Sequence, residues 1–171
     1  VVSLKNSGAF TASATLPMKG IPTSIAFVTT NTAAITLGSA GIVLIDFVEP
    51  TSPMELQHIG TPGPALGAAS TENYLLVSTW KELRLYDASE RGILRLLDGT
   101  DAIIQTPFDV SDPFYTGLIL ASHVATQGTR FVVTELNAIL TGTISPGVDA
   151  PRIYLHDRQQ VVNASESATS V

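Results

Sequence analysis

The chain carries an internal repeat of about 42 residues, and no other feature constrains its fold as strongly. One copy spans residues 22–46 and a second spans residues 64–87; each opens on a proline and ends on an aspartate. Further prolines follow at nearly the same interval, at Pro107 and Pro151. Repeats of 40 to 50 residues made of short strands are typical of β-propeller blades. The repeat therefore predicts an all-β chain and not a helical one.

Within each copy, short apolar runs are separated by Gly, Pro, Asn, Asp and Ser, which is the pattern of strands and turns. The first copy predicts a strand after Pro22 and three more, and the second repeats this order. The expected strands are 25–28, 33–37, 42–46 and 54–59, then a run after Pro64, 74–78, 83–87 and 93–97. Four strands per copy is the number in one propeller blade.

The third copy is less regular. After Pro107 its remaining strands are expected at 117–123, 129–136 and 139–144, with extra residues around 109–115 and 124–128. The segments 2–6 and 10–15 would be the outer strands of a preceding blade, and 151–156 and 160–163 the inner strands of a following one.

The whole chain then predicts a β-propeller of four-stranded antiparallel blades, about four blade equivalents with one blade split between the termini. Pairing the two ends would remove open sheet edges. Residues 1–163 form the expected propeller or propeller portion, and the Ser/Ala-rich residues 164–171 a flexible tail or linker. The chain starts at Val1 without an initiator Met, so we expect it to be processed or excised from a longer one.

The segment 41–53, Gly-Ile-Val-Leu-Ile-Asp-Phe-Val-Glu-Pro-Thr-Ser-Pro, resembles an LVIVD repeat, and 83–89 is a looser match. The resemblance covers residues 21–99; the third copy departs from it, since no Asp follows Val132-Val133 in the matching place. LVIVD repeats occur mostly in bacterial and archaeal surface proteins, which implies a propeller at the cell surface or outside the cell. Independently of the family, Asp46 and Asp87 are expected to accept hydrogen bonds from the amides of the turns that follow them.

Composition excludes several classes of function. The net charge is −6 with only nine Lys and Arg, so neither nucleic acid nor an anionic membrane surface is an expected partner. The absence of Cys removes disulfides, thiolate metal sites and a cysteine nucleophile. No apolar run approaches the roughly 20 residues that span a bilayer.

The sequence offers few candidate site residues. Trp80, in an expected loop between strands, could anchor a partner or stack on a sugar, although packing against a neighbouring blade is an alternative. The irregular third copy adds Asp109, Asp112 and Tyr115 as possible partner contacts, and Asn163 begins a glycosylation sequon. The histidines are too widely spaced for a zinc motif, and no cofactor or metal is expected.

These features favour a non-enzymatic interaction or structural module in an extracellular or cell-surface assembly. Its partner would be a protein, including a second copy of the chain or the rest of a longer chain that completes the ring. One alternative is a carbohydrate-binding or hydrolytic propeller with a site at the mouth of its channel. Another is the propeller portion of a larger scaffold subunit in an intracellular complex.

Overall fold

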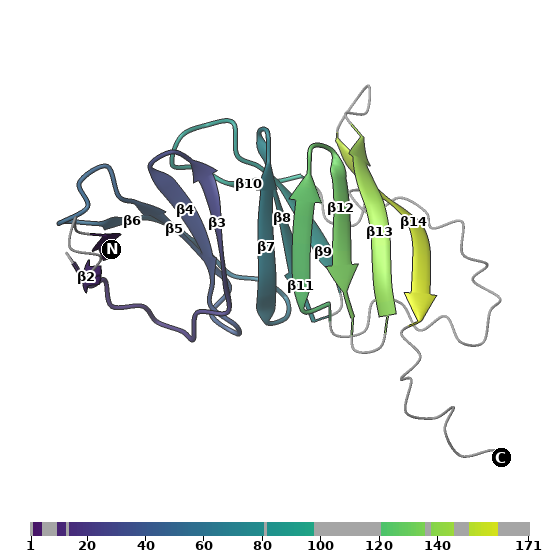
Figure 1. Ribbon diagram of the computed structural model, residues 1–171, viewed down its shortest axis with the longest axis horizontal. Coiled ribbons are helices and arrows are strands. Elements are labelled where there is room, and N and C mark those ends of the chain that lie inside the picture. The colour runs from purple at the N-terminus through teal and green to yellow at the C-terminus, as the bar shows by residue number, and fades with distance from the viewer. Residues whose placement is uncertain are drawn as a thin grey trace, which may run out of the picture.

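The structure is a computed structural model that describes residues 2–4, 10–12, 14–80, 82–97, 121–135, 138–145 and 151–160. In these residues the chain forms strands and no helix, so the all-β prediction is confirmed. Three four-stranded antiparallel sheets follow one another along the long axis, and a two-stranded sheet lies beside the first of them (Figure 1).

Each four-stranded sheet is a meander whose strands pair in the order of the sequence. The first sheet contains β3 (Ser24–Thr29), β4 (Thr32–Thr36), β5 (Ile42–Asp46) and β6 (Met54–Ile59). The second contains β7 (Ala65–Thr71), β8 (Tyr74–Thr79), β9 (Leu83–Asp87) and β10 (Arg95–Leu96). The third contains β11 (His123–Gln127), β12 (Arg130–Thr134), β13 (Ala138–Ser145) and β14 (Arg152–Gln160). The two-stranded sheet is β1 (Val2–Leu4) with β2 (Phe10–Ala12).

The first two strands of each four-stranded sheet are joined by a two-residue turn. The pairs that close these turns are Thr29 with Thr32, Thr71 with Tyr74, and Gln127 with Arg130. Two-residue hairpin loops commonly need a positive φ, because only then does the turn match the twist of the strands. Glu72 has φ 47° and Gly128 has φ 56°, so the chain adopts this conformation in the second and third sheets.

The core lies between the sheets. One apolar cluster joins the first sheet to the second and includes Ile42, Leu44, Leu75 and Val77. Another joins the second sheet to the third and includes Leu76, Leu83, Leu85, Phe131 and Val133. The second sheet is thus covered on both faces, which explains why β8 is apolar at consecutive positions and not only at alternate ones.

The first strands of the three sheets, β3, β7 and β11, lie side by side (Figure 1) and are joined by hydrogen bonds from hydroxyl groups to main-chain carbonyls. Thr23 Oγ1 donates to Ala65 O at 2.9 Å, and Thr126 Oγ1 donates to Ser70 O at 2.7 Å. The hydroxyl of Ser70 donates in turn to the carbonyl of Phe27. These bonds satisfy polar groups where the sheets meet, so Ser and Thr are tolerated in otherwise apolar contacts.

The predicted strands of the first two copies are confirmed almost residue for residue; the main difference is β10, which is shorter than expected. The third copy was misplaced by one strand. The segment around 124–128, expected as an insertion, contains most of β11, and β11 packs on β7 in the way that β7 packs on β3. The strands expected third and fourth in this copy are β12 and β13, the second and third strands of the sheet, and most of the strand expected second, 117–123, lies outside the described residues.

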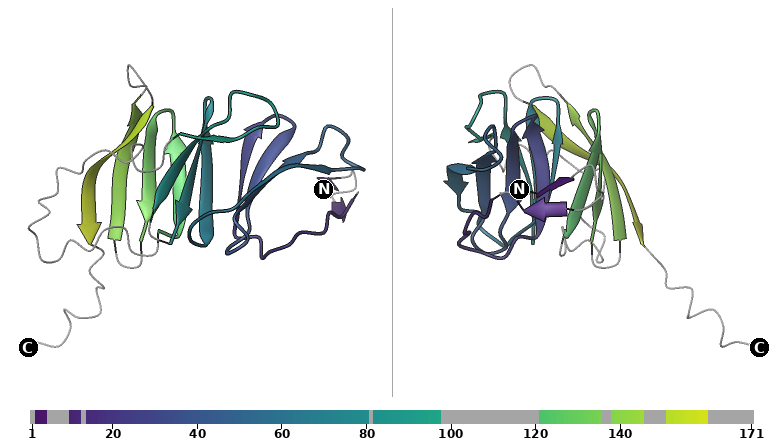
Figure 2. Two further views of the ribbon diagram at one scale, coloured as in Figure 1. Left: turned by 180° about the vertical axis from the view of Figure 1, so that it is seen from behind. Right: turned by 60° about the vertical axis from the view of Figure 1, so that its left-hand side comes forward.

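The predicted strand pairing at the two termini is also wrong. Residues 152–160 form a single strand that pairs with β13 as the last strand of the third sheet, and do not start a following blade. Strands β1 and β2 pair with each other, as expected for two outer strands. They lie at the opposite end of the array from β14, both in Figure 1 and in the view from behind in Figure 2. The described sheets form an open array that does not close into a ring.

Candidate interaction surfaces

The first sheet has one face that no other four-stranded sheet covers, and this face is apolar. We call it the open face: it consists of Ile25, Phe27, Ile35, Ile45 and Phe47 on strands β3 to β5 and just after them. Because side chains alternate along a strand, these residues point away from Ala26, Ala34 and Leu44, which pack toward the second sheet. Together with Leu16, Met18, Ala33 and Pro53 they line a hollow of about 430 Å³.

Part of the open face is shielded and part is not. Leu16 and Met18, in the segment that leads into β3, pack against the buried residues Val43 and Ile45. Phe27 nevertheless remains 62% exposed, as does Ile25 at 56%. The Phe27 ring meets the edge of Phe47, with centroids 5.8 Å apart and an angle of 74° between the ring planes. Neighbouring exposed apolar side chains of this size mark a surface that binds a partner more often than isolated ones do.

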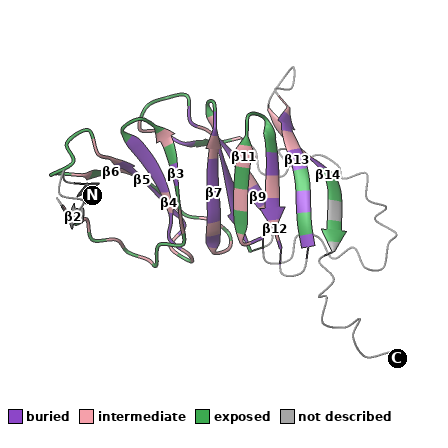
Figure 3. Ribbon diagram, viewed as in Figure 1, coloured by how far each residue is buried: buried purple, intermediate pink, exposed green. Residues whose placement is uncertain are grey.

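The outer face of the third sheet, at the other end of the array, is mainly polar, with Ile139 exposed at 39% beside Thr134. Phe131, Val133, Ile153 and Leu155 point toward the second sheet. The residues that alternate with them therefore point outward: Arg130, Val132, Thr134, Arg152, Tyr154 and His156. On β13 the buried and exposed residues alternate in the same way (Figure 3). The two ends of the described array therefore differ in character, because the open face is apolar and the outer face of the third sheet is mainly polar.

Trp80 follows β8, in the turn before β9, as the sequence predicted. Its side chain is 50% exposed. Its main-chain N–H donates to Pro64 O at 3.2 Å, which ties the turn to the segment that enters β7. Pro62, Gly63, Pro64, Thr79, Trp80 and Glu82 line a hollow of about 330 Å³.

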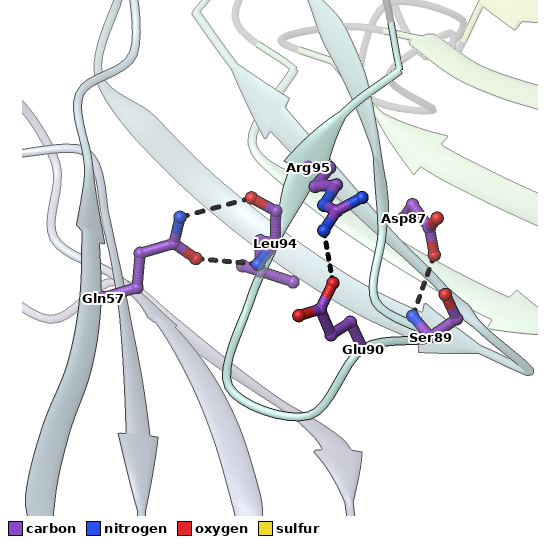
Figure 4. Close-up of polar contacts among 6 residues, drawn as sticks. All are labelled: Gln57, Asp87, Ser89, Glu90, Leu94 and Arg95. Atoms are coloured by element: carbon purple, nitrogen blue, oxygen red, sulfur yellow. Dashed lines mark hydrogen bonds and ion pairs between the residues drawn. The ribbon is translucent and has the colours of Figure 1, made fainter.

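Asp46 and Asp87 have the predicted structural role in turns. Asp46 Oδ1 accepts from the N–H of Val48, and Asp87 Oδ1 accepts from that of Ser89, both at 2.8 Å. Figure 4 shows the second of these contacts. The pKa of the Asp87 carboxyl is lowered because the hydroxyl and then the amide of Ser89 donate to its charged form. Both carboxylates therefore stabilise turns and are not free for chemistry.

Two polar groups link the first sheet to the second near their outer edges. The side-chain amide of Gln57, on β6, makes two hydrogen bonds with the main chain of Leu94. Its Oε1 accepts from Leu94 N at 2.7 Å, and its Nε2 donates to Leu94 O at 3.3 Å (Figure 4). Arg91 Nη2 lies 3.1 Å from Asp46 Oδ2. Tyr86 is fully buried between the same sheets, and burial raises the pKa of its phenol. These groups have structural roles.

The other candidate site residues, Asp109, Asp112, Tyr115 and Asn163, lie outside the described residues. The open face was missed by the sequence reasoning. A signal for it existed, because β3 carries apolar residues at consecutive positions from Ile25 to Val28, and such a run predicts a strand that is covered on both faces.

Among the described residues, no three His, Asp or Glu side chains gather in a group that could hold a metal ion. His58 contacts Ala40 O, and His156 contacts Thr143 Oγ1 at 2.8 Å, each on a different sheet. In the part of the chain that the structure describes, no helix is long and apolar enough to cross a membrane.

Comparisons with known proteins give no family. No protein-family model matches the chain, and no curated protein matches it. Among solved structures, the crystal structure of LS24, a seed albumin from Lathyrus sativus, is similar with 16% sequence identity and a TM-score of 0.37. The match covers 78% of this chain and 66% of the albumin chain. A TM-score this low does not assign a fold, and the identity does not carry function.

Proposed function

We propose that the chain is a non-enzymatic structural and interaction module whose three four-stranded sheets are blades of β-propeller type, and that a second copy of the chain covers the open face. The observation that carries this proposal is the contrast between the two ends of the array, one apolar and one polar. By resemblance to LVIVD repeats, we place the module in an extracellular or cell-surface assembly.

The blade assignment is supported by how the sheets meet. In a propeller the innermost strands of consecutive blades lie next to one another and the outermost strands lie at the rim. Strands β3, β7 and β11 lie next to one another and each begins its sheet, as innermost strands of consecutive blades would. Equivalent hydroxyl-to-carbonyl contacts join β7 to β3, from Ser70 to Phe27, and β11 to β7, from Thr126 to Ser70. On this assignment the three sheets are part of a ring that further blades would complete.

A second copy fits the open face better than a polar surface does. Burial of apolar surface contributes about 25 cal/mol per Å² only when the water on both partners is displaced without stranding polar groups. The outer face of the third sheet would strand Arg130 and Arg152, so head-to-tail stacking is unfavourable. When two open faces meet across a two-fold axis, the side chains of Ile25, Phe27 and Phe47 bring no charge into the contact. Each copy then uses the same patch of surface.

The size of the face sets the expected affinity. The three strands that carry the open face, spaced about 4.8 Å apart and five to six residues long, cover roughly 260 Å² in projection. Two such faces bury less than the roughly 1,200 Å² typical of stable complexes, so the dimer should be weak. We expect a Kd in the range of about 10 to 300 μM, at which a dimer forms only at high protein concentration.

Sedimentation equilibrium tests the proposal. The wild-type mass should rise from 18.0 kDa toward twice that value between about 5 and 500 μM. Phe27→Asp should remain monomeric throughout, because it would place a charge in an apolar contact. Ile139→Asp is the matched control: Ile139 is also exposed, at 39%, but lies on β13 of the third sheet. It should dimerise like the wild type.

Three outcomes would overturn the proposed dimer. The wild type could stay at 18.0 kDa at every concentration. Phe27→Asp could dimerise as well as the wild type while its far-UV circular dichroism is unchanged. Ile139→Asp could abolish the dimer, which would mean that the first sheet of one copy contacts the third sheet of the next and that two copies close a ring head to tail.

A further inference from the structure

The hollow beside Trp80 is a second surface, on a different sheet from the open face, and it combines an aromatic ring with polar groups. Trp80 and Glu82 come from the turn between β8 and β9, and Pro62 and Pro64 from the segment that enters β7. Trp80 N donates to Pro64 O, which joins the two segments, and Thr79 N donates to Glu82 O at 2.8 Å, which closes the turn between β8 and β9. The position of the indole is thus set by strands and not by a long loop.

The polar groups in this hollow are only partly used. Glu82 Oε2 lies 3.1 Å from Arg84 Nε, and the other carboxylate oxygen, Oε1, has no hydrogen-bond partner among the described residues. The indole N–H of Trp80 likewise has none among them. The Thr79 hydroxyl donates to Glu82 O at 3.2 Å, and Thr79 is only 1% exposed, so it is not open to a ligand. The hollow therefore presents an apolar wall together with one free donor, the indole N–H of Trp80, and one free acceptor, Glu82 Oε1.

The charge in the hollow is nearly balanced, and this narrows the class of ligand. The Arg84 side chain is only 15% exposed, and its guanidinium partly offsets the negative charge of Glu82. A cationic ligand would gain less from Glu82 than from an unpaired carboxylate, and an anionic ligand would be repelled by it. A proline-rich peptide could stack on Trp80, but proline residues bring no N–H to donate to Glu82. A ligand with both an apolar face and hydroxyl donors fits all the groups.

We propose that this hollow binds a neutral saccharide, with the C–H face of one pyranose ring stacked on the Trp80 indole and a sugar hydroxyl donating to Glu82 Oε1. The Trp80 indole supplies the apolar contact area, and the hydrogen bond to Glu82 fixes the orientation of the sugar. This site does not depend on the proposed dimer, because no residue of the open face lines it.

The chain contains a single Trp, so the fluorescence of Trp80 reports binding directly. We would titrate the full chain with maltotriose, cellotriose and N-acetylated chitotriose, each to about 30 mM. With one aromatic platform and one or two hydrogen bonds, a Kd of about 0.3 to 10 mM is expected, so millimolar ligand is needed. At least one of the three sugars should change the emission saturably with a Kd in this range.

Saturation-transfer difference NMR extends the test to variants that lack the fluorophore. Trp80→Ala should weaken binding at least tenfold, and Trp80→Phe, which keeps an aromatic face, by less. Glu82→Gln keeps an acceptor oxygen and should weaken binding by less than about threefold, whereas Glu82→Ala removes it and should weaken binding about three- to tenfold. Phe27→Asp is the control on the open face and should bind the sugar like the wild type.

The proposal is overturned if none of the three sugars binds saturably. It is also overturned if Trp80→Ala binds a sugar as well as the wild type does. Tetramethylammonium chloride and a proline-rich decapeptide are the competing probes, and binding of either one without any sugar would assign the hollow to that class of ligand. Loss of dimerisation in Phe27→Asp with unchanged sugar binding would separate this site from the proposed function.

Discussion

Gly67, on β7, allows β7 and β11 to approach closely, and replacing it with Ala should destabilise the fold. A Cβ atom at this position would lie 2.7 Å from Ser78 Oγ and 2.9 Å from both Ser122 O and His123 Cα. Two of these three atoms belong to the main chain at the start of β11, so the clash cannot be relieved by turning one side chain. The second and third sheets would have to separate locally.

The magnitude follows from two opposing terms. Forcing an extra methyl group into a packed contact costs about 1 to 3 kcal/mol. Ala also restricts the unfolded chain more than Gly does, which stabilises the folded state by about 0.4 to 1 kcal/mol. We therefore expect Gly67→Ala to lower the free energy of unfolding by about 1 to 2 kcal/mol. For a chain of 171 residues this corresponds to a Tm lower by about 2 to 8 °C.

Gly60→Ala is the matched control, because a Cβ atom at Gly60 would have no heavy atom within 4 Å. It should leave the stability unchanged or raise it by up to about 1 kcal/mol. Urea unfolding of the wild type and both variants, followed by far-UV circular dichroism, gives the comparison. If Gly67→Ala were as stable as Gly60→Ala, β7 and β11 would not be packed at this distance and the proposed stacking of blades would be refuted.

Three further predictions concern the contacts between the first two sheets and the turn after β9. Leu44→Ala opens a cavity in the core that joins these sheets, so it should cost about 2 to 5 kcal/mol in urea unfolding; a loss below 1 kcal/mol would contradict that packing. Gln57→Leu keeps the side-chain volume but removes both hydrogen bonds to Leu94, so unfolding free energy should fall by about 1 to 3 kcal/mol, and faster amide hydrogen exchange at Leu94 would locate the effect. Because the folded pKa of Asp87 is lowered, its charge stabilises the fold above the unfolded pKa, and this contribution is lost as the pH falls through the folded pKa. Asp87→Asn should therefore be less stable than the wild type at pH 7 but not at the acid end of a pH series; a difference that stays constant with pH would contradict this explanation.

The sequence predicted the first two sheets closely, and the reason is visible in particular residues. The run 42–46 and the run 83–87 each end in an Asp that closes the following turn, and such local turn chemistry needs no tertiary information. Hydroxyl and Gly positions such as Ser70 and Gly67 gave no signal in the sequence. The Ser70 hydroxyl donates to a carbonyl 43 residues away, and a Cβ atom at Gly67 would meet the main chain of Ser122 and His123 in the third sheet.

The third sheet was misplaced because its position was inferred from the spacing of prolines. Pro151 precedes β14, the last strand of its sheet, whereas Pro64 precedes β7, the first strand of its own. Proline lacks an N–H and is therefore tolerated at the start of any strand of a sheet. Its position marks where a strand begins but does not show whether that strand is the first or the last of its sheet. The contacts of β11 with β7, including the hydrogen bond from Thr126 to Ser70 O, identify β11 as the first strand of its sheet.

By itself the sequence determined that the chain is all-β, that its repeat is about 42 residues long, and where strands and turns of the first two copies lie. These properties follow from local patterns: the alternation of side chains, turn residues and the spacing of the copies. The tertiary structure alone decided that the sheets form an open array with one apolar and one polar end, and that Trp80 borders an accessible hollow. The physical reason is that an apolar side chain shows that burial is favourable but does not identify the surface that buries it, and among the described residues no four-stranded sheet covers the open face of the first sheet.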